Sequence, residues 1–183
     1  QKSVENAAKV IKEHGYARVV SHYDADGLTS AGIICNALLR RGIQFHATIV
    51  SKLEHSFIHG LDEELVIFCD MGTAQSDLIS AYLKEKNVII IDHHAPLASA
   101  PPSTSSFVLI NPCCFSMEEG SEMCAAGISY LVARCLAGDG ERGEDNIDLA
   151  GLAVAGTLGD KLEMDSGVNK LILDEAVKEG VIS

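Results

Sequence analysis

The fold is indicated by residues 16–27, which read YARVVSHYDADG. The stretch begins with mostly apolar residues, including adjacent valines, and this composition favours a buried strand. A polar run and Gly27 follow, and residues 28–41 then show the apolar spacing of a helix that stops at Gly42. Thr29 or Ser30 is expected to help cap that helix. This strand-to-helix unit predicts the first segment of an α/β fold.

The alternation of strand and helix continues along the chain. Further strands are expected at residues 43–50, 64–69, 87–91 and 107–110, and further helices at residues 3–14, 75–86, 123–137, 146–158 and 168–179. Residues 95–106, rich in Pro, Ser and Ala, and residues 138–145, which read GDGERGED, are expected to be loops. Because strands that alternate with helices pair in parallel, we predict a three-layer α/β domain. Its mostly parallel five-stranded sheet would carry helices on both faces.

The composition is that of one domain, which we expect to occupy residues 1–183. Hydrophobic residues make up 47% and aromatic residues 5%, with no Trp, so aliphatic side chains must fill the core. No apolar run reaches the length of a membrane span, and the six cysteines show no C-x-x-C spacing. We therefore expect a cytoplasmic protein with reduced thiols and no membrane partner. The oligomeric state stays open.

The charge of the chain limits how it could bind nucleic acid. A formal net charge of −12 argues against a broad basic surface of the kind that holds phosphates. The same charge is compatible with a site that concentrates divalent cations. Contact with nucleic acid would then run through bound metal, a few local Lys and Arg side chains, or a further domain.

Four polar clusters follow predicted strands or close a predicted helix. They are His22-Tyr23-Asp24-Ala25-Asp26-Gly27, Asp70-Met71-Gly72, Asp92-His93-His94 and Gly156-Thr157-Leu158-Gly159-Asp160. A single Asp at a strand end is usually a turn or cap residue. However, the carboxyl ends of parallel strands lie at one edge of a sheet, where ligands bind in such folds. The four clusters together therefore favour one shared site.

The chemistry of that site points to metal. Many carboxylates in one place repel one another and resist ionisation unless cations lie between them. Mixed His and carboxylate ligands suit Mn²⁺, with Mg²⁺ as the alternative and Zn²⁺ compatible through its higher intrinsic affinity. Two divalent ions about 3.5–4 Å apart can activate a water and stabilise the leaving oxygen of a phosphate ester. The residues thus predict a two-metal phosphoesterase.

The set H-x-D-x-D-G, D-x-G, D-H-H and G-x-x-x-D resembles the DHH superfamily of phosphoesterases. This superfamily includes RecJ exonucleases, family II pyrophosphatases, nanoRNases and exopolyphosphatases. The resemblance covers residues 16–160, and the segments SHYDADGLTSA, DMGTAQ and IDHHAP are most similar to archaeal RecJ-like nucleases. Pyrophosphatases and nanoRNases typically place three residues between the first His and the first Asp. Here only Tyr23 separates His22 from Asp24, which disfavours those branches.

The resemblance implies ligands for two metal ions. The first ion would be held by His22, Asp24 and Asp70. The second would be held by Asp26, Asp70, His93 and Asp160, so that Asp70 bridges the two. Of the remaining catalytic residues, His94 would face the substrate, by binding the scissile phosphate or aiding proton transfer. Asp92 would orient an adjacent histidine.

The activity implied by the resemblance is exonucleolytic hydrolysis of single-stranded DNA or RNA, in DNA repair or replication, with replisome proteins as candidate partners. One alternative is a small-nucleotide phosphohydrolase that acts on oligonucleotides, cyclic dinucleotides or nucleotide bisphosphates. Another is a replisome scaffold with little activity. Enzymes of this family normally also carry a C-terminal substrate-binding domain, and nothing after Asp160 resembles one. We therefore expect that domain to be absent from this chain, either through shortening or because it lies on another chain.

Overall fold

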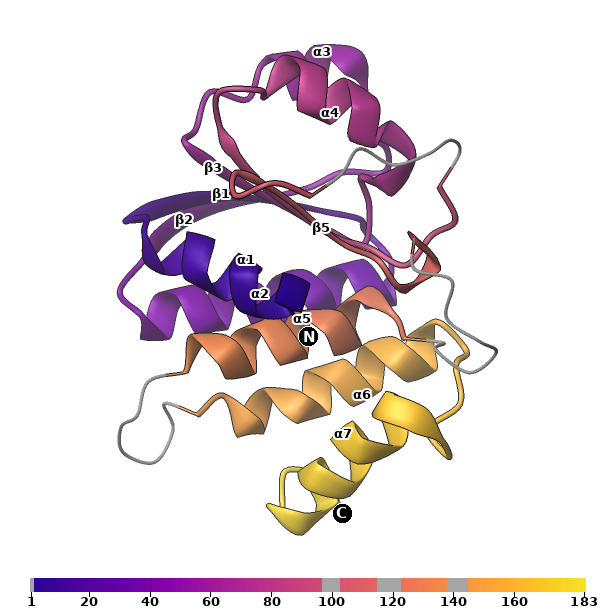
Figure 1. Cartoon of the computed structure of the whole chain (residues 1–183). Coiled ribbons are helices and arrows are strands. Elements are labelled where there is room, and N and C mark those ends of the chain that lie inside the picture. Colours follow the sequence, from indigo (N-terminus) through magenta and orange to yellow (C-terminus); the bar gives the residue numbers. More distant parts are fainter. Residues whose placement is uncertain (1, 97–102, 115–122, 138–144) are drawn as a thin grey trace.

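A single parallel sheet forms the centre of the computed structural model, which describes residues 2–96, 103–114, 123–137 and 145–183. Its strands are β1 (Tyr16–Ser21), β2 (Gln44–Ile49), β3 (Leu65–Cys69), β4 (Asn87–Ile91) and β5 (Phe107–Ile110). They lie in the order β2-β1-β3-β4-β5, and each neighbouring pair is parallel (Figure 1). The predicted α/β fold with a five-stranded sheet is therefore confirmed. All the carboxyl ends of the strands lie at one edge.

Helices cover both faces of the sheet, as predicted. The helices are α1 (Lys2–Lys12), α2 (Ala25–Arg40), α3 (His55–His59), α4 (Ser76–Tyr82), α5 (Ala125–Leu136), α6 (Ala150–Gly159) and α7 (Gly167–Lys178). One face packs against α1, α2 and α5, and the other packs against α3 and α4 (Figure 1). Helices α6 and α7 lie outside α2 and α5, so this side of the sheet is two helices deep.

The sheet is buried by the aliphatic residues that the composition requires. Every residue of β3 and β5 is buried, because apolar side chains alternate between the two helical layers. The edge strand β2 is exposed along most of its length. Within the described ranges, no helix is both long enough and apolar enough to cross a bilayer. All six cysteines are free thiols.

Several element boundaries differ from the sequence prediction for local reasons. Helix α2 begins at Ala25, because the Asp24 side chain accepts a hydrogen bond from Gly27 N and acts as the N-cap. Thr29 is therefore not the cap, and its hydroxyl instead donates to the Ala25 carbonyl. The short helix α3 was not predicted. Half of the predicted loop at 95–106 and all of the predicted loop at 138–145 except Asp145 lie outside the described residues.

Candidate metal centre

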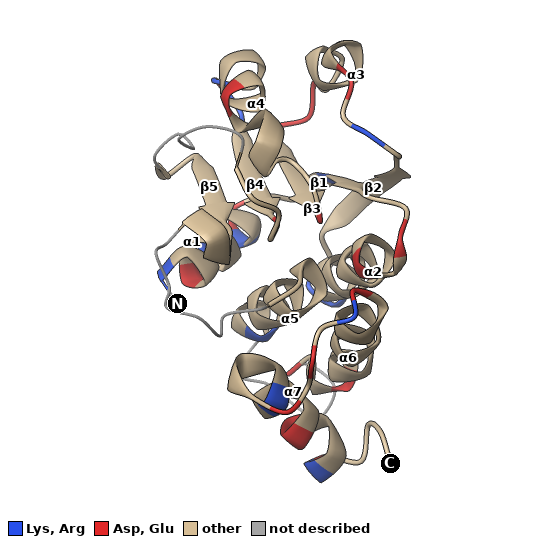
Figure 2. Cartoon of the chain, turned by 90° about the vertical axis from the view of Figure 1, so that its right-hand side faces the viewer, with Lys and Arg blue, Asp and Glu red and all other residues tan. Residues whose placement is uncertain are grey.

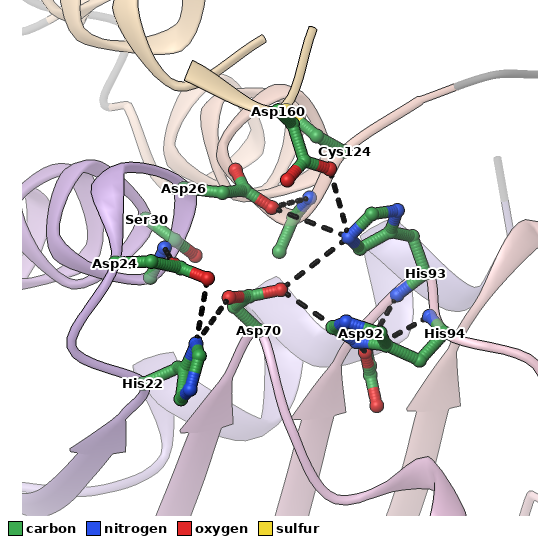
Figure 3. A network of polar contacts seen from close by, with 12 residues as sticks. His22, Asp24, Asp26, Ser30, Asp70, Asp92, His93, His94, Cys124 and Asp160 are labelled. Atoms are coloured by element: carbon green, nitrogen blue, oxygen red, sulfur yellow. Dashed lines mark hydrogen bonds and ion pairs between the residues drawn. The ribbon is translucent and has the colours of Figure 1, made fainter. Parts of the chain in front are cut away.

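The first ligand candidates stand directly after three neighbouring strands. Backbone hydrogen bonds extend the parallel pairing one residue beyond the strands: from His22 N to Cys69 O, from Asp70 N to Ile91 O and from Asp92 N to Ile110 O. The polar residues are thus held in register with the sheet. Figure 3 shows that their side chains converge at this edge, together with those of the first turn of α2 and the end of α6.

Asp70 lies at the centre of the cluster in an unusual backbone conformation. Its φ is 58°, in the left-handed region, and Gly72 two residues later has a φ of 115°. Among residues other than glycine, Asp and Asn are the ones that tolerate this region best. The turn places the Asp70 carboxylate between two imidazoles, 3.4 Å from His22 Nδ1 and 3.4 Å from His93 Nε2.

Within the described part of the chain, candidate ligand atoms gather in three groups, each with its atoms within 4.8 Å of one another. The groups are His22, Asp24 and Asp70; Asp26, His93 and Asp160; and Asp70, His93 and His94. The first contains the residues predicted for one metal. The second contains three of the four residues predicted for the other metal. The fourth, Asp70, lies 3.4 Å from His93 of that group. The structure therefore brings all the predicted ligands together.

The buried polar atoms at the centre fit bound cations. Both carboxylate oxygens of Asp70 and Nε2 of His93 are buried without a hydrogen-bond partner among the described residues. Leaving such atoms unsatisfied costs about 1–3 kcal/mol each. His93 Nε2 also lies 3.6 Å from Asp26 and 3.2 Å from Asp160. Divalent cations between these oxygens and nitrogens would satisfy the unpartnered atoms, so the residues fit a metal centre.

The charges in the cluster perturb one another. Burial raises the pKa of Asp70 well above its usual range, and the nearby carboxylates of Asp26 and Asp24 add to this effect. Burial also raises the pKa of Asp160, and Asp26 contributes in the same direction although His93 opposes it. A site that resists holding its own negative charge is one that positive ions would stabilise.

Asp26 is held by a helix that the sequence analysis did not connect with it. Its Oδ2 accepts a hydrogen bond from Ala125 N and its Oδ1 accepts one from Ala126 N, both at 2.8 Å. These amides open α5, so the positive end of the helix dipole faces the Asp26 carboxylate. The sequence predicts a helix at residues 123–137 but no part for it in the site. The hydrogen bonds join residues about a hundred positions apart, and no local pattern indicates them.

Close contact between helices brings Asp160 into the cluster. A Cβ on Gly156 would lie 2.4 Å from Thr29 Oγ1 and 2.5 Å from the Cβ of Ala126. A Cβ on Gly159 would lie 2.5 Å from that of Ala25. The glycines therefore allow the end of α6 to touch the start of α2. This approach places Asp160 beside Asp26 and His93.

Asp92 and His94 form a pair next to the ligand cluster, in which the Asp92 side chain is buried and the His94 side chain is half-exposed. The ring Nδ1 of His94 lies 2.8 Å from Asp92 Oδ1, and Thr73 N donates to Asp92 Oδ2. Burial alone would raise the pKa of Asp92, but hydrogen bonds from His94 and Thr73 outweigh it and lower the pKa to about 2. The bond to Asp92 raises the pKa of His94 to about 9, although burial opposes the shift. His94 is thus the histidine that Asp92 contacts through its side chain.

Asn111 and Cys113 donate hydrogen bonds to the backbone carbonyls of His94 and His93. Neither was among the predicted site residues. Asn111 is fully buried, and its Nδ2 donates to the His94 carbonyl and to Thr73 Oγ1, both at 2.8 Å. Cys113 Sγ donates to the His93 carbonyl at 3.1 Å. The available signal was the position of Asn111, directly after β5 at the same edge of the sheet as the ligands.

Comparisons with known proteins agree with this geometry. The model of the DHH family, N-terminal domain, matches residues 17–157. An uncharacterised protein of Methanocaldococcus jannaschii is 37% identical over 187 residues, which cover 96% of this chain and 41% of that protein. The single-stranded-DNA-specific exonuclease RecJ of Thermus thermophilus is 29% identical over 175 residues, which cover 90% of this chain and 24% of that protein.

A solved structure shares the fold. The crystal structure of an exonuclease RecJ bound to manganese superposes with a TM-score of 0.79 at 24% identity, over 96% of this chain and 47% of that chain. The chain therefore spans less than half the length of the curated relatives it matches.

Proposed function

Because this chain belongs to the DHH family of phosphoesterases, we propose that it hydrolyses phosphodiester bonds of single-stranded DNA or RNA from an end, with two divalent metal ions. The observation that carries the proposal is the position of Asp70. Its buried oxygens accept no hydrogen bond from the described residues and lie between the two ligand groups. A carboxylate in this position suits a bridge between two cations.

The proposed ligands follow the geometric groups. His22, Asp24 and Asp70 would hold one ion, and Asp26, Asp70, His93 and Asp160 would hold the other. Bound there, the ions would activate water and offset negative charge on the phosphate. Mn²⁺ is the favoured metal and Mg²⁺ the alternative. The RecJ structure bound to manganese supports this choice by analogy.

The chain's own residues would handle the proton and the substrate. His94 has a half-exposed side chain, and its Nδ1 is engaged by Asp92, so Nε2 is the ring atom left for the substrate. The raised pKa of His94 suits a group that carries a proton near neutral pH. We assign His94 Nε2 to the scissile phosphate or the leaving oxygen, and Asp92 to orienting the ring.

The choice of substrate is supported by the similarity to the single-stranded-DNA-specific RecJ. The spacing of one residue between His22 and Asp24 also favours the RecJ-like branch of the family over the branches that act on small molecules. Docking on replisome proteins is a further proposal that rests on the same resemblance.

The test is hydrolysis of an end-labelled single-stranded oligonucleotide in Mn²⁺, compared with hydrolysis of a dinucleotide. We expect a ladder of products from the long strand, and loss of all products in EDTA and in Asp70→Asn. The matched control is Asp174→Asn, which makes the same change at a surface residue of α7 paired with Lys170, and it should keep full activity. Cleavage of the dinucleotide alone would replace the nuclease proposal with the small-nucleotide alternative.

A further inference from the structure

Tyr23 stands between two proposed metal ligands and points into solvent. It separates His22 from Asp24, yet 59% of the residue is exposed. Its ring meets the ring of His22 edge-on, with centroids 4.6 Å apart and planes at 62°. Its hydroxyl forms no hydrogen bond within the described ranges of the chain. The contact with His22 leaves most of this large aromatic side chain uncovered.

Other exposed apolar side chains occur on the segments that carry the ligands. Leu28 lies on the first turn of α2, after Asp26, and is 49% exposed; Leu158 lies on the last turn of α6, before Asp160, and is 58% exposed. These two turns touch, because Gly159 packs against Ala25. The two turns that carry the proposed ligands Asp26 and Asp160 thus also carry an exposed apolar side chain each.

The charge distribution limits the other ways of holding a nucleic acid strand here. Figure 2 shows acidic segments at the end of β3 and at the start of α2, where the ligands lie. The whole chain carries a net charge of −12. Phosphates of the strand that do not contact the metal ions would therefore gain little electrostatic attraction from the protein. Stacking of a base on an aromatic ring needs no charge and contributes about 1–3 kcal/mol per base.

We infer that Tyr23 is a substrate-positioning residue that stacks on the base of the nucleotide next to the scissile phosphate. It would thereby select nucleotide phosphodiesters over diesters that lack a base. This inference rests on the proposed function and adds a determinant of specificity to it. It assigns to Tyr23 a contact with substrate, in addition to its packing against His22.

The chain offers a direct optical test because it contains no Trp. Tyr23→Trp would introduce a single indole at the proposed stacking position. The ligand is a phosphorothioate oligothymidylate, which is hydrolysed slowly, in the presence of Mn²⁺. We expect saturable quenching of the indole fluorescence. An oligomer of equal length with abasic sugars should give no quenching.

The matched control for this test is Tyr82→Trp. Tyr82 is also an exposed tyrosine, 43% accessible, and it also meets histidine rings edge-on, at His55 and His59. It lies on α4, on the opposite face of the sheet from α2. Its fluorescence should not respond to the oligonucleotide. Equal quenching at both positions, or none at position 23, would overturn the inference.

Steady-state kinetics on proteins without the introduced Trp distinguish two roles of Tyr23: stacking on a base and supporting the ring of His22. Tyr23→Ala should raise KM for the normal strand about 5- to 50-fold with kcat nearly unchanged, whereas Tyr23→Phe should behave like the wild type. Removal of the terminal bases should raise KM in the wild type but have no further effect in Tyr23→Ala. Mn²⁺ affinity by calorimetry should stay the same in all three proteins.

A loss of Mn²⁺ affinity in Tyr23→Ala, with equal effects on normal and abasic strands, would show that the ring only supports His22 and would contradict the inference. The wild-type hydrolysis assay tests the proposed function separately. If the wild type cleaves the strand but the indole of Tyr23→Trp is not quenched, the inference about stacking is wrong and the proposed function still stands.

Discussion

Asp70 combines three properties that a merely structural carboxylate would not combine: burial, a left-handed φ and oxygens that no hydrogen-bond donor of the described residues reaches. Each of these destabilises a protein that lacks a compensating ligand. Together they indicate that the centre of the site is arranged for cations at the expense of the stability of the metal-free fold.

We predict that Asp70→Asn stabilises the metal-free protein by about 1–3 kcal/mol in free energy of unfolding. Asn tolerates the same φ, removes a charge from among carboxylates, and can donate hydrogen bonds to them. Thermal unfolding in EDTA measures the gain. Mn²⁺ should raise the melting temperature of the wild type more than that of the variant. A variant that is less stable than the wild type in EDTA would contradict this view of Asp70.

Asp92→Asn should lower stability, because both Asp92 oxygens accept backbone hydrogen bonds, from Thr73 N and His94 N, and an amide can accept on one side only. It should also lower hydrolysis about 10- to 100-fold, as is typical for groups that orient an active-site histidine. The reason is that His94 Nδ1 would lose its charged partner. Steady-state rates measure the effect, and calorimetry should show that Mn²⁺ still binds. An unchanged rate would mean that the contact of Asp92 with His94 does not contribute to the reaction.

The residues that follow strand ends could be predicted from the sequence, because a parallel sheet brings those ends together whatever the details of packing. Asn111 also follows a strand end, that of β5, and this position was the signal available for it. The amides of Ala125 and Ala126 could not be predicted, because their hydrogen bonds to Asp26 join segments about a hundred residues apart. Such contacts depend on how helices and loops pack, which leaves no periodic pattern in the sequence.

Helix α6 contributes to the site through its close approach to α2, which depends on Gly156. We predict that Gly156→Ala lowers stability by about 1–3 kcal/mol and weakens Mn²⁺ binding, because the added methyl would press on Thr29 and Ala126 and displace Asp160. Thermal unfolding and calorimetry measure the two effects.

The control for that change is Gly32→Ala. Gly32 also lies in a helix, but a Cβ there would meet only Leu152 Cδ1, at an ordinary 3.7 Å. This variant should be as stable as the wild type or more stable by up to about 1 kcal/mol, since alanine favours the helix. Equal losses at both positions would show that the close contact at Gly156 has no special role.

At the level of elements, the strands were predicted more accurately than the helices. The strands at 16–21, 87–91 and 107–110 have the predicted bounds, because buried apolar runs end sharply at polar residues. The start of α2 was misplaced because Asp24 serves both as a cap and as a candidate ligand. The short helix α3 has too few residues to show a helical period.

For the whole molecule, the negative charge should make substrate binding only weakly sensitive to salt. Proteins that contact many phosphates through Lys and Arg lose about 10³-fold or more in affinity between 50 and 200 mM salt. With a net charge of −12 and binding through metal and stacking, we expect KM for a single strand to rise less than about 10-fold over this range at fixed Mn²⁺. A rise of about 10³-fold would reveal a basic binding surface that this account omits.

The order of the strands is a property of the whole molecule that the sequence patterns did not specify. Alternating elements indicate a parallel sheet, but several strand orders satisfy that pattern. The observed order places β1 between β2 and β3, so that His22, Asp70 and Asp92 follow three adjacent strands. This adjacency makes one compact cluster out of motifs far apart in the chain.

The most direct test of the central claim is a calorimetric titration of the wild-type chain with Mn²⁺, beside Asp70→Asn. If the cluster is a two-metal centre bridged by Asp70, the wild type should bind two ions per chain and the variant should lose at least one of them. No binding by the wild type, or the same binding in the variant, would contradict the account.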